Sequence, residues 1–390
     1  MFRLLSLALL CTCCLVGAST AQGQPTVVVD IAGGLGSDTT DLQLGIFMAS
    51  PGGTVIVRPA PQSMNYSQVF INQSVTLRGE EGAPPTLSQV SIGSLNSTQR
   101  VVLSNVFIRE FGVTGLVVDN CFGRVHLDRI QDGTVGIIGL DVAIRNSGSV
   151  TMTDCGPFHT IMVEDSRVAA TNVTATAPGQ LQPATVPTIQ LVRSTLSLAN
   201  SVVSGVTAQA ALCSSVVVAT PAVSLEQSEL SFDRATSITG GVVDAIFPSP
   251  MICGMNPAFV GPSGTVRGPT AAGSEPGITF VQENVFPATV NYDASGDLLV
   301  SVAAEGNPGG YLFLSPLATA TTVFAPFVAW VNFTMTIPVG FIAADGQGDC
   351  VYRVQAPSSL VPFGTPLSWQ WLVATPTGAV LGEPAVTLVR

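Results

Sequence analysis

The sequence predicts an all-β protein in two parts, a solenoid of stacked short strands followed by a β-sandwich-like domain. The first observation is a repeat: TIQLVRSTLSLANSVVSG (residues 188–205) and AVSLEQSELSFDRATSITG (residues 222–240) share Leu-x-x-Ser-x-Leu-Ser followed by Leu or Phe. The second is a change after about residue 250, where Pro- and Gly-rich turns separate strand-like runs that lack the repeat. Short strands that recur every 20–50 residues without helical periodicity are typical of a solenoid.

The first 21 residues have the features of a secretory signal. Arg3 provides a basic start, an apolar run extends from Leu4 to Gly17, and a small-residue site ends at Ala21. We therefore expect residues 1–21 to be removed and the protein to be secreted or extracytoplasmic.

The repeat extends across most of residues 25–250. A single coil of short strands cannot bury its apolar face, so coils stack with their strands about 4.8 Å apart. Inward positions then stay apolar while outward positions vary. The polar anchors of successive coils, 20 to 34 residues apart, are Ser74, Asn96, Asn120, Asn146, Ser166, Ser194 and Ser228. The expected inward positions are Val75, Leu77, Val125, Leu127, Val150, Met152, Leu196, Leu198, Leu230 and Phe232.

The open start of such a stack needs a cover, because unpaired strand edges aggregate. The stretch SDTTDLQLGIFMAS offers Thr40 or Asp41 as an N-cap and places Leu42, Ile46 and Phe47 on one helical face. We expect a short cap helix here, with GGTVIVRPA (residues 52–60) as the first strand.

The order of cap helix, PGGTVIVRP (residues 51–59), Tyr66 and INQSVTLRG (residues 71–79) resembles the opening of right-handed parallel β-helix proteins of the pectate-lyase-like superfamily. The resemblance covers roughly residues 25–250 and implies a right-handed parallel β-helix there. It implies no single activity, because the superfamily contains lyases, hydrolases, epimerases and adhesins. The Asn-Thr-Asp, Asp-Asp, Gly-His-Gly and Arg-Ile-Lys segments of its polygalacturonase-type hydrolases and the Trp-Ile-Asp-His segment of many pectate lyases are missing.

The remaining chain predicts a linker over residues 251–276 and a β-sandwich-like domain over residues 277–390. Its ending resembles C-terminal β-modules of secreted bacterial proteins. The uncharged run from Leu312 to Ala344 is interrupted by three prolines and alternates with a period of two, so we expect buried strands there rather than a membrane span. Trp369 and Trp371 share one strand face and suit either a sugar-stacking platform or a sandwich core.

The composition argues against several partners. Only 10% of the residues are charged, the formal charge is −11, and all 14 basic residues are arginine. Nucleic acids and anionic lipids are bound largely through cations, so we expect neither as a partner. Beyond the expected signal the sequence also lacks Cys-x-x-Cys and His-x-His spacings, and we expect no metal and no cofactor.

Five of the eight cysteines lie beyond the expected signal, so at least one cannot pair within the chain. Export permits disulfides, and Cys121 with Cys155 or Cys213 with Cys253 are possible pairs. The alternative is that these residues and Cys350 are buried thiols that pack as small apolar side chains.

One stretch gathers groups that could act on or bind a sugar. In GRVHLDRI, Arg124, His126 and Asp128 alternate with inward residues and therefore share an outer face. Asp154 and His159 are expected close to the next turn. These five side chains form either a ladder of ordinary solvated groups or a site with a base, a charge neutraliser and an arginine that matches a uronate carboxylate.

These observations favour a secreted β-helix protein of binding, adhesion or surface-structural type, with a polysaccharide or cell-surface glycan as the expected partner. A polysaccharide lyase or glycoside hydrolase with an atypical site is the alternative. A third is a spacer that displays its C-terminal module.

Overall fold

The structure is a computed structural model. It describes residues 25–49, 51–61, 64–109, 114–133, 139–176, 186–205, 208–210, 220–240, 242–245, 251–255, 258–268, 276–282, 284–316, 322–324, 327–329, 336–362 and 364–390. The expected signal over residues 1–21 lies outside these ranges.

The chain opens with β1 (Thr26–Val29), the helix α2 (Leu42–Met48) and β2 (Thr54–Val57). The cap helix is confirmed, and its start is fixed by Asp41, whose side chain accepts a hydrogen bond from the Leu44 amide at 2.8 Å. The prediction that Phe47 shares the buried face is wrong, because its side chain is 74% exposed. A strand before the helix, β1, was also not expected.

A large parallel sheet follows, in which each strand pairs with the equivalent strand one coil later. This arrangement is consistent with a β-helix, and the strands fall into three rows. The first row consists of β3 (Val69–Ile71), β6 (Val90–Gly93), β8 (Leu116–Asp119), β10 (Leu140–Arg145), β12 (Phe158–Glu164) and β15 (Ile189–Val192). The second row consists of β1, β2, β4 (Val75–Gly79), β7 (Arg100–Ile108), β9 (Arg124–Asp132), β11 (Val150–Thr153), β13 (Arg167–Thr171), β16 (Thr195–Ala199) and β24 (Ile278–Gln282). The third row contains β5 (Thr86–Leu87), β14 (Thr174–Thr176), β17 (Val202–Ser204) and β20 (Ser237–Thr239) together with the ends of β7 and β9. Two long strands, β19 (Val223–Phe232) and β23 (Phe259–Gly268), run through the first and second rows.

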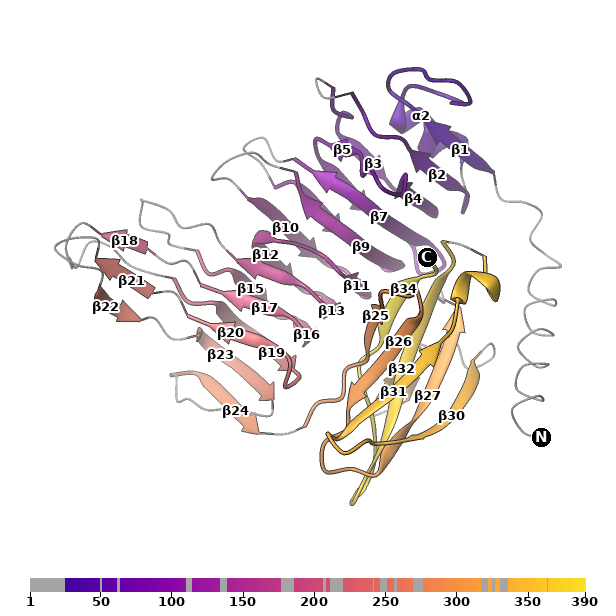
Figure 1. The fold of residues 1–390 in the computed structure, drawn as a ribbon. Coiled ribbons are helices and arrows are strands. Elements are labelled where there is room, and N and C mark those ends of the chain that lie inside the picture. The colour runs from indigo at the N-terminus through magenta and orange to yellow at the C-terminus, as the bar shows by residue number, and fades with distance from the viewer. Residues whose placement is uncertain are drawn as a thin grey trace, which may run out of the picture.

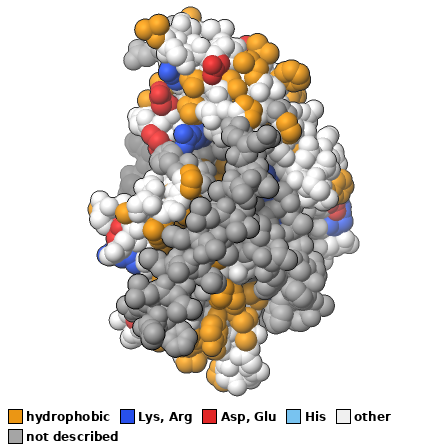
Figure 2. All heavy atoms as spheres, turned by 90° about the vertical axis from the view of Figure 1, so that its right-hand side faces the viewer, with side chains coloured by type: hydrophobic (Ala, Val, Ile, Leu, Met, Phe, Trp, Pro, Cys, Tyr) orange, Lys and Arg blue, Asp and Glu red, His pale blue; other side chains and the backbone are white. Residues whose placement is uncertain are grey.

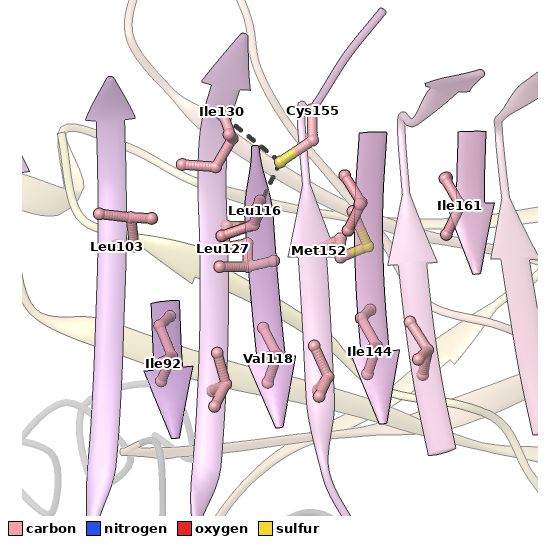
Figure 3. Packing of buried hydrophobic residues seen from close by; sticks show 14 of the residues in the cluster. Ile92, Leu103, Leu116, Val118, Leu127, Ile130, Ile144, Met152, Cys155 and Ile161 are labelled. Carbon is pink, nitrogen blue, oxygen red and sulfur yellow. Dashed lines mark hydrogen bonds between the residues drawn. The ribbon is translucent and has the colours of Figure 1, made fainter. Parts of the chain in front are cut away.

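The interior between these rows is apolar. All ten positions expected to point inward are buried in one hydrophobic cluster, which confirms the alternation assigned from the sequence. Figure 3 shows how register builds this core, with Ile92, Val118 and Ile144 aligned on first-row strands and Leu103 and Leu127 aligned on second-row strands.

The turns between the first and second rows are joined by a ladder of serines. The amide of Ser147 donates to Ser166 Oγ, the amide of Ser166 to Ser194 Oγ, and the amide of Ser194 to Ser228 Oγ, at 2.9 to 3.1 Å. These serines are buried, and the hydroxyls satisfy amides that the strand pairing leaves without a partner. Three anchors of the sequence repeat are therefore the hydrogen-bonding groups that tie one coil to the next.

The expected linker over residues 251–276 is wrong in its described part. β22 (Met251–Met255) pairs with β21 (Val242–Ala245), which in turn pairs with β18 (Ala208–Ala210). β23 pairs with β19, and β24 continues the parallel sheet to Gln282. Turn-rich composition hid β22 and β23, because Gly254 lies within β22, and Pro262 and Gly264 lie within β23. We call Thr26–Gln282 the stacked-strand region.

Antiparallel sheets form the C-terminal domain, Phe286–Arg390, as expected for a β-sandwich. Two of them share one core that contains Trp369 and Trp371, so these tryptophans are core residues and not an exposed platform. One sheet consists of β25 (Thr289–Tyr292), β26 (Leu298–Ala303) and β31 (Asp349–Val354). The other consists of β27 (Gly309–Pro316), β30 (Ile337–Ala343), β32 (Pro366–Thr375), β33 (Gly378–Leu381) and β34 (Ala385–Leu388). The remaining elements are a β28–β29 hairpin (Thr322–Phe324 and Phe327–Ala329) and a 3-10 turn, Pro357–Ser359.

The C-terminal domain packs alongside the stacked-strand region (Figure 1). β34 lies against β9, β11 and β13, on the outer face of the second row. The described part of Leu312–Ala344 forms strands, as expected. None of the helices in the ranges given above is long and apolar enough to cross a membrane.

Neighbouring valines of β17 test the inward and outward assignment. Val203 is fully buried between Ala175 and Ile238, whereas the Val202 side chain is 45% exposed. We expect Val203→Ala to lower the free energy of unfolding by about 2 kcal/mol through lost burial and an added cavity, and Val202→Ala to change it by less than about 0.5 kcal/mol. Urea denaturation of both variants measures the difference, and equal losses would contradict the assignment.

Candidate functional site

The residues singled out in GRVHLDRI lie where the sequence predicts, on alternate outward positions of β9. Parallel pairing with β11 sets His126 beside Thr151 and Asp128 beside Thr153. Arg124 stands between Arg100 of β7 and the start of β11. The outward side chains of β9 and β11 are therefore aligned from one coil to the next.

The expectation that this face is open to a polysaccharide is wrong. Arg124 is 2% exposed, and His126 and Asp128 are fully buried. They lie under the C-terminal domain, where Val386 and Leu388 of β34 form a small apolar cluster with Val102. Thr153 Oγ1 also donates to the Val386 carbonyl at 2.7 Å. The cover is built by residues more than 200 positions further along the chain.

Asp128 is the centre of a polar network beneath this cover. Its carboxylate accepts hydrogen bonds from Ser104 Oγ at 2.7 Å, Arg129 Nε at 3.1 Å and Arg390 Nη2 at 3.3 Å. Burial opposes its ionisation, but Arg390, His126, Arg129 and the Ser104 hydroxyl together hold the pKa of Asp128 below its usual value. Asp128 is thus a compensated buried anion.

Arg390 connects this network to the next coil. Asp154, in a left-handed turn conformation, accepts from Arg390 Nη2 at 2.7 Å and from Asn172 Nδ2 at 2.8 Å. The guanidinium of Arg390 also lies 4.9 Å from the ring centroid of Tyr292. The structure therefore brings Asp154 close to Asp128, as predicted, through an arginine that the sequence did not suggest.

His126 is held neutral. Its Nδ1 lies 2.9 Å from Thr151 Oγ1, and burial lowers the pKa of His126 to about 4, although Asp128 and Asp154 act in the opposite direction. His126 is therefore not available as the base of the expected sugar site, because its side chain is fully buried. Burial similarly lowers the pKa of Arg124 to about 10.

His159 does not join this group. It belongs to β12 in the first row, where its Nδ1 lies 3.1 Å from Asp141 Oδ1. The His159 side chain remains 21% exposed. Of the five predicted residues, the structure brings four together and separates this one.

The described cysteine side chains lie in the protein interior. Cys121, Cys155 and Cys350 are buried free thiols, so the Cys121–Cys155 disulfide is wrong. Cys155 Sγ donates to the Thr153 carbonyl at 3.2 Å, and burial raises the pKa of the Cys155 thiol. Cys213 and the side chain of Cys253 lie outside the described residues.

An open groove occurs further along the second-row face, beyond the C-terminal domain. It has a volume of about 510 Å³. Pairing aligns Thr195, Glu229, Thr265 and Thr279 across four successive strands on its floor. Its described lining residues, which we call the groove, are Arg193, Ser194, Thr195, Gln227, Ser228, Glu229, Ser263, Gly264, Thr265, Gly277 and Thr279.

Polar side chains form most of the groove lining. Hydroxyl, amide and guanidinium groups line it, and its carboxylate, Glu229, accepts from Arg267 Nε at 2.7 Å. Sequence reasoning missed it because its residues look like ordinary solvated outward positions. The signal that could have found it is the recurrence of threonine at one outward position in three of four successive strands.

The lowered pKa of His126 predicts a pH dependence of stability. Between about pH 6.5 and pH 4 the unfolded chain binds a proton at His126 that the folded chain does not, so stability falls as the pH is lowered through this interval, by about 3 kcal/mol in all. Urea denaturation at pH 7 and pH 4 measures the loss. His126→Asn should remove this part of the loss, and an unchanged pH dependence in the variant would contradict it.

The ion pairs of Arg390 predict that this residue helps to hold the C-terminal domain against the stacked-strand region. Replacing it by glutamine leaves Asp128 buried with fewer partners, and we expect a loss of about 1–3 kcal/mol with faster amide exchange in β34. Arg353→Gln is the matched control, because Arg353 also pairs with an aspartate, Asp293, but is 54% exposed. That exposed pair should contribute at most about 1 kcal/mol. Equal effects of the two variants would show that Arg390 does not hold the domain.

Among the described residues, no three His, Cys, Asp or Glu side chains are grouped so that they could hold a metal ion. Comparison with protein families and with curated proteins adds no relative: no family model matches the chain, and no curated protein matches it.

Proposed function

We propose that the chain is a secreted binding protein of the right-handed parallel β-helix, pectate-lyase-like type, and that it binds a neutral polysaccharide in the groove without cleaving it. The observation that carries the proposal is a difference between two parts of the outer face of the second row. The part rich in ionisable groups is closed, and the part rich in hydroxyl groups is open.

The closed part argues against catalysis at Arg124, His126 and Asp128. A general base must reach the proton that it removes, and His126 is fully buried behind β34. Asp128 is fully engaged by Ser104 and Arg390. These groups support the position of the C-terminal domain instead.

The open part suits an extended sugar chain. The four floor positions, Thr195, Glu229, Thr265 and Thr279, repeat at the strand spacing of about 4.8 Å, which is close to the length of one pyranose unit in an extended chain. Each coil can therefore present a hydrogen-bonding group to one sugar. The formal charge of −11 disfavours an acidic chain.

The low charge density of the surface agrees with a neutral ligand. On the one face that Figure 2 shows, the described red and blue side chains lie singly or in small groups among hydrophobic and uncharged ones. Neutral polysaccharides are bound through hydrogen bonds and contacts with apolar ring faces, and such binding does not depend on a strong surface field.

The alternative is a hydrolase or lyase that acts in the groove. Inverting or retaining glycoside hydrolysis uses a pair of carboxyl groups. The described lining of the groove contains a single carboxylate, Glu229, which is paired with Arg267. Binding without turnover is therefore the better-supported function.

Affinity measurements on a panel of neutral polysaccharides test this proposal, with release of reducing ends or unsaturated products scored in parallel. Thr265→Val with Thr279→Val removes two floor hydroxyls at nearly constant shape, and we expect about a tenfold loss of affinity, or 1.4 kcal/mol. Thr239→Val, on a third-row strand, is the control. Product release would favour the enzyme alternative, and unchanged affinity in the double variant would remove the groove from the proposal.

A further inference from the structure

We propose that a second site, at the other end of the second-row face, binds an oxyanion such as a carboxylate, sulfate or phosphate group. The site is a cleft of about 290 Å³ between the first strands of the second row and the C-terminal domain. Its described lining residues, which we call the cleft, are Thr26, Thr54, Ile56, Thr76, Arg78, Arg100, Gly364, Thr365 and Pro366.

Strand register aligns a row of threonine hydroxyl groups along one side of the cleft. Thr26 pairs with Thr54 and Thr54 with Thr76, so three threonines of β1, β2 and β4 stand side by side on the outer face. Such a row offers hydroxyl donors at the strand spacing of about 4.8 Å. Thr365, contributed by the C-terminal domain, also lines the cleft.

Two arginines give the cleft its charge. Arg78 lies two residues after Thr76 on β4, and Arg100 begins β7 on the next coil. No aspartate or glutamate occurs among the described lining residues. In a chain with a formal charge of −11, two guanidinium groups in a cleft whose described lining has no carboxylate form a local positive site.

One acidic side chain that affects Arg78, Glu81, is itself bound by Arg129. Glu81 acts on the pKa of Arg78, but both of its carboxylate oxygens accept from Arg129, at 3.0 Å each. Burial lowers the pKa of both Arg78 and Arg100. An anionic group in the cleft would be attracted by the two guanidinium groups, and the threonine hydroxyls that line the cleft could donate to its oxygens.

The backbone of the C-terminal domain closes the cleft on its other side. Gly364 has a φ of +79°, and a side chain there would lie 2.9 Å from Arg78 Nη1. The glycine thus permits a close approach of the two parts while leaving the guanidinium in place. Arginine matches the planar geometry of carboxylates and the oxygens of sulfate and phosphate through paired donors.

Isothermal titration of the full chain at constant ionic strength tests the site, with sodium sulfate, sodium phosphate, glucuronate and a sulfated disaccharide as ligands and glucose as the neutral comparison. We expect saturable binding of at least one oxyanion and none of glucose. Tighter binding of the sulfated disaccharide or glucuronate than of the inorganic ions would assign the anion to a saccharide, and the reverse order to a free ion.

Four single variants locate the site. Arg100→Gln and Thr76→Val should each weaken oxyanion binding, by at least tenfold and about threefold respectively, whereas Arg145→Gln, an exposed arginine on β10, should leave it unchanged. Thr265→Val in the groove should also have no effect, so the two sites succeed or fail separately. Absence of saturable binding, or equal losses in Arg100→Gln and Arg145→Gln, would overturn the proposal.

Discussion

Parallel pairing in register between one coil and the next is the constraint on which the structure depends. Each strand obtains its hydrogen-bond partners from the coils on either side, so a residue necessarily stands over its equivalent. The apolar rows fill the interior, and the serine ladder from Ser147 to Ser228 completes the turns. The same register aligns Thr26, Thr54 and Thr76 at one end of the outer face and Thr195, Thr265 and Thr279 at the other.

The C-terminal domain divides that outer face into unlike parts. Its contact with β9 and β11 combines apolar packing by Val386 with ion pairs from Arg390 to Asp128 and Asp154. Buried ion pairs contribute less to net stability than their number suggests, but they penalise any arrangement that leaves one charge alone. The two aspartates come from successive coils, so a shift of the domain along the stack by one strand would break the pairing.

Periodicity made the core and the outward side of β9 predictable. Alternation with a period of two assigns Val125 and Leu127 inward and His126 outward, and the structure agrees. The cover over His126 was not predictable, because a contact with Val386 leaves no local pattern in either segment. The strand β23 was missed for a different reason: Pro262 and Gly264 read as turn residues although they lie within a paired strand. Phe47 shows the same limit, since helical periodicity gives a face but not the extent of its cover.

The strand register has a consequence for how this architecture can change length. A coil inserted beyond β16 would extend the groove by one strand spacing and leave the core rows intact. An inserted coil between β9 and β11 would separate Asp128 from Asp154, and Arg390 could no longer reach both. The C-terminal domain therefore fixes the number of coils in the part of the stack that it covers. Outside this part, coils can be added and their outward residues can vary without breaking these ion pairs.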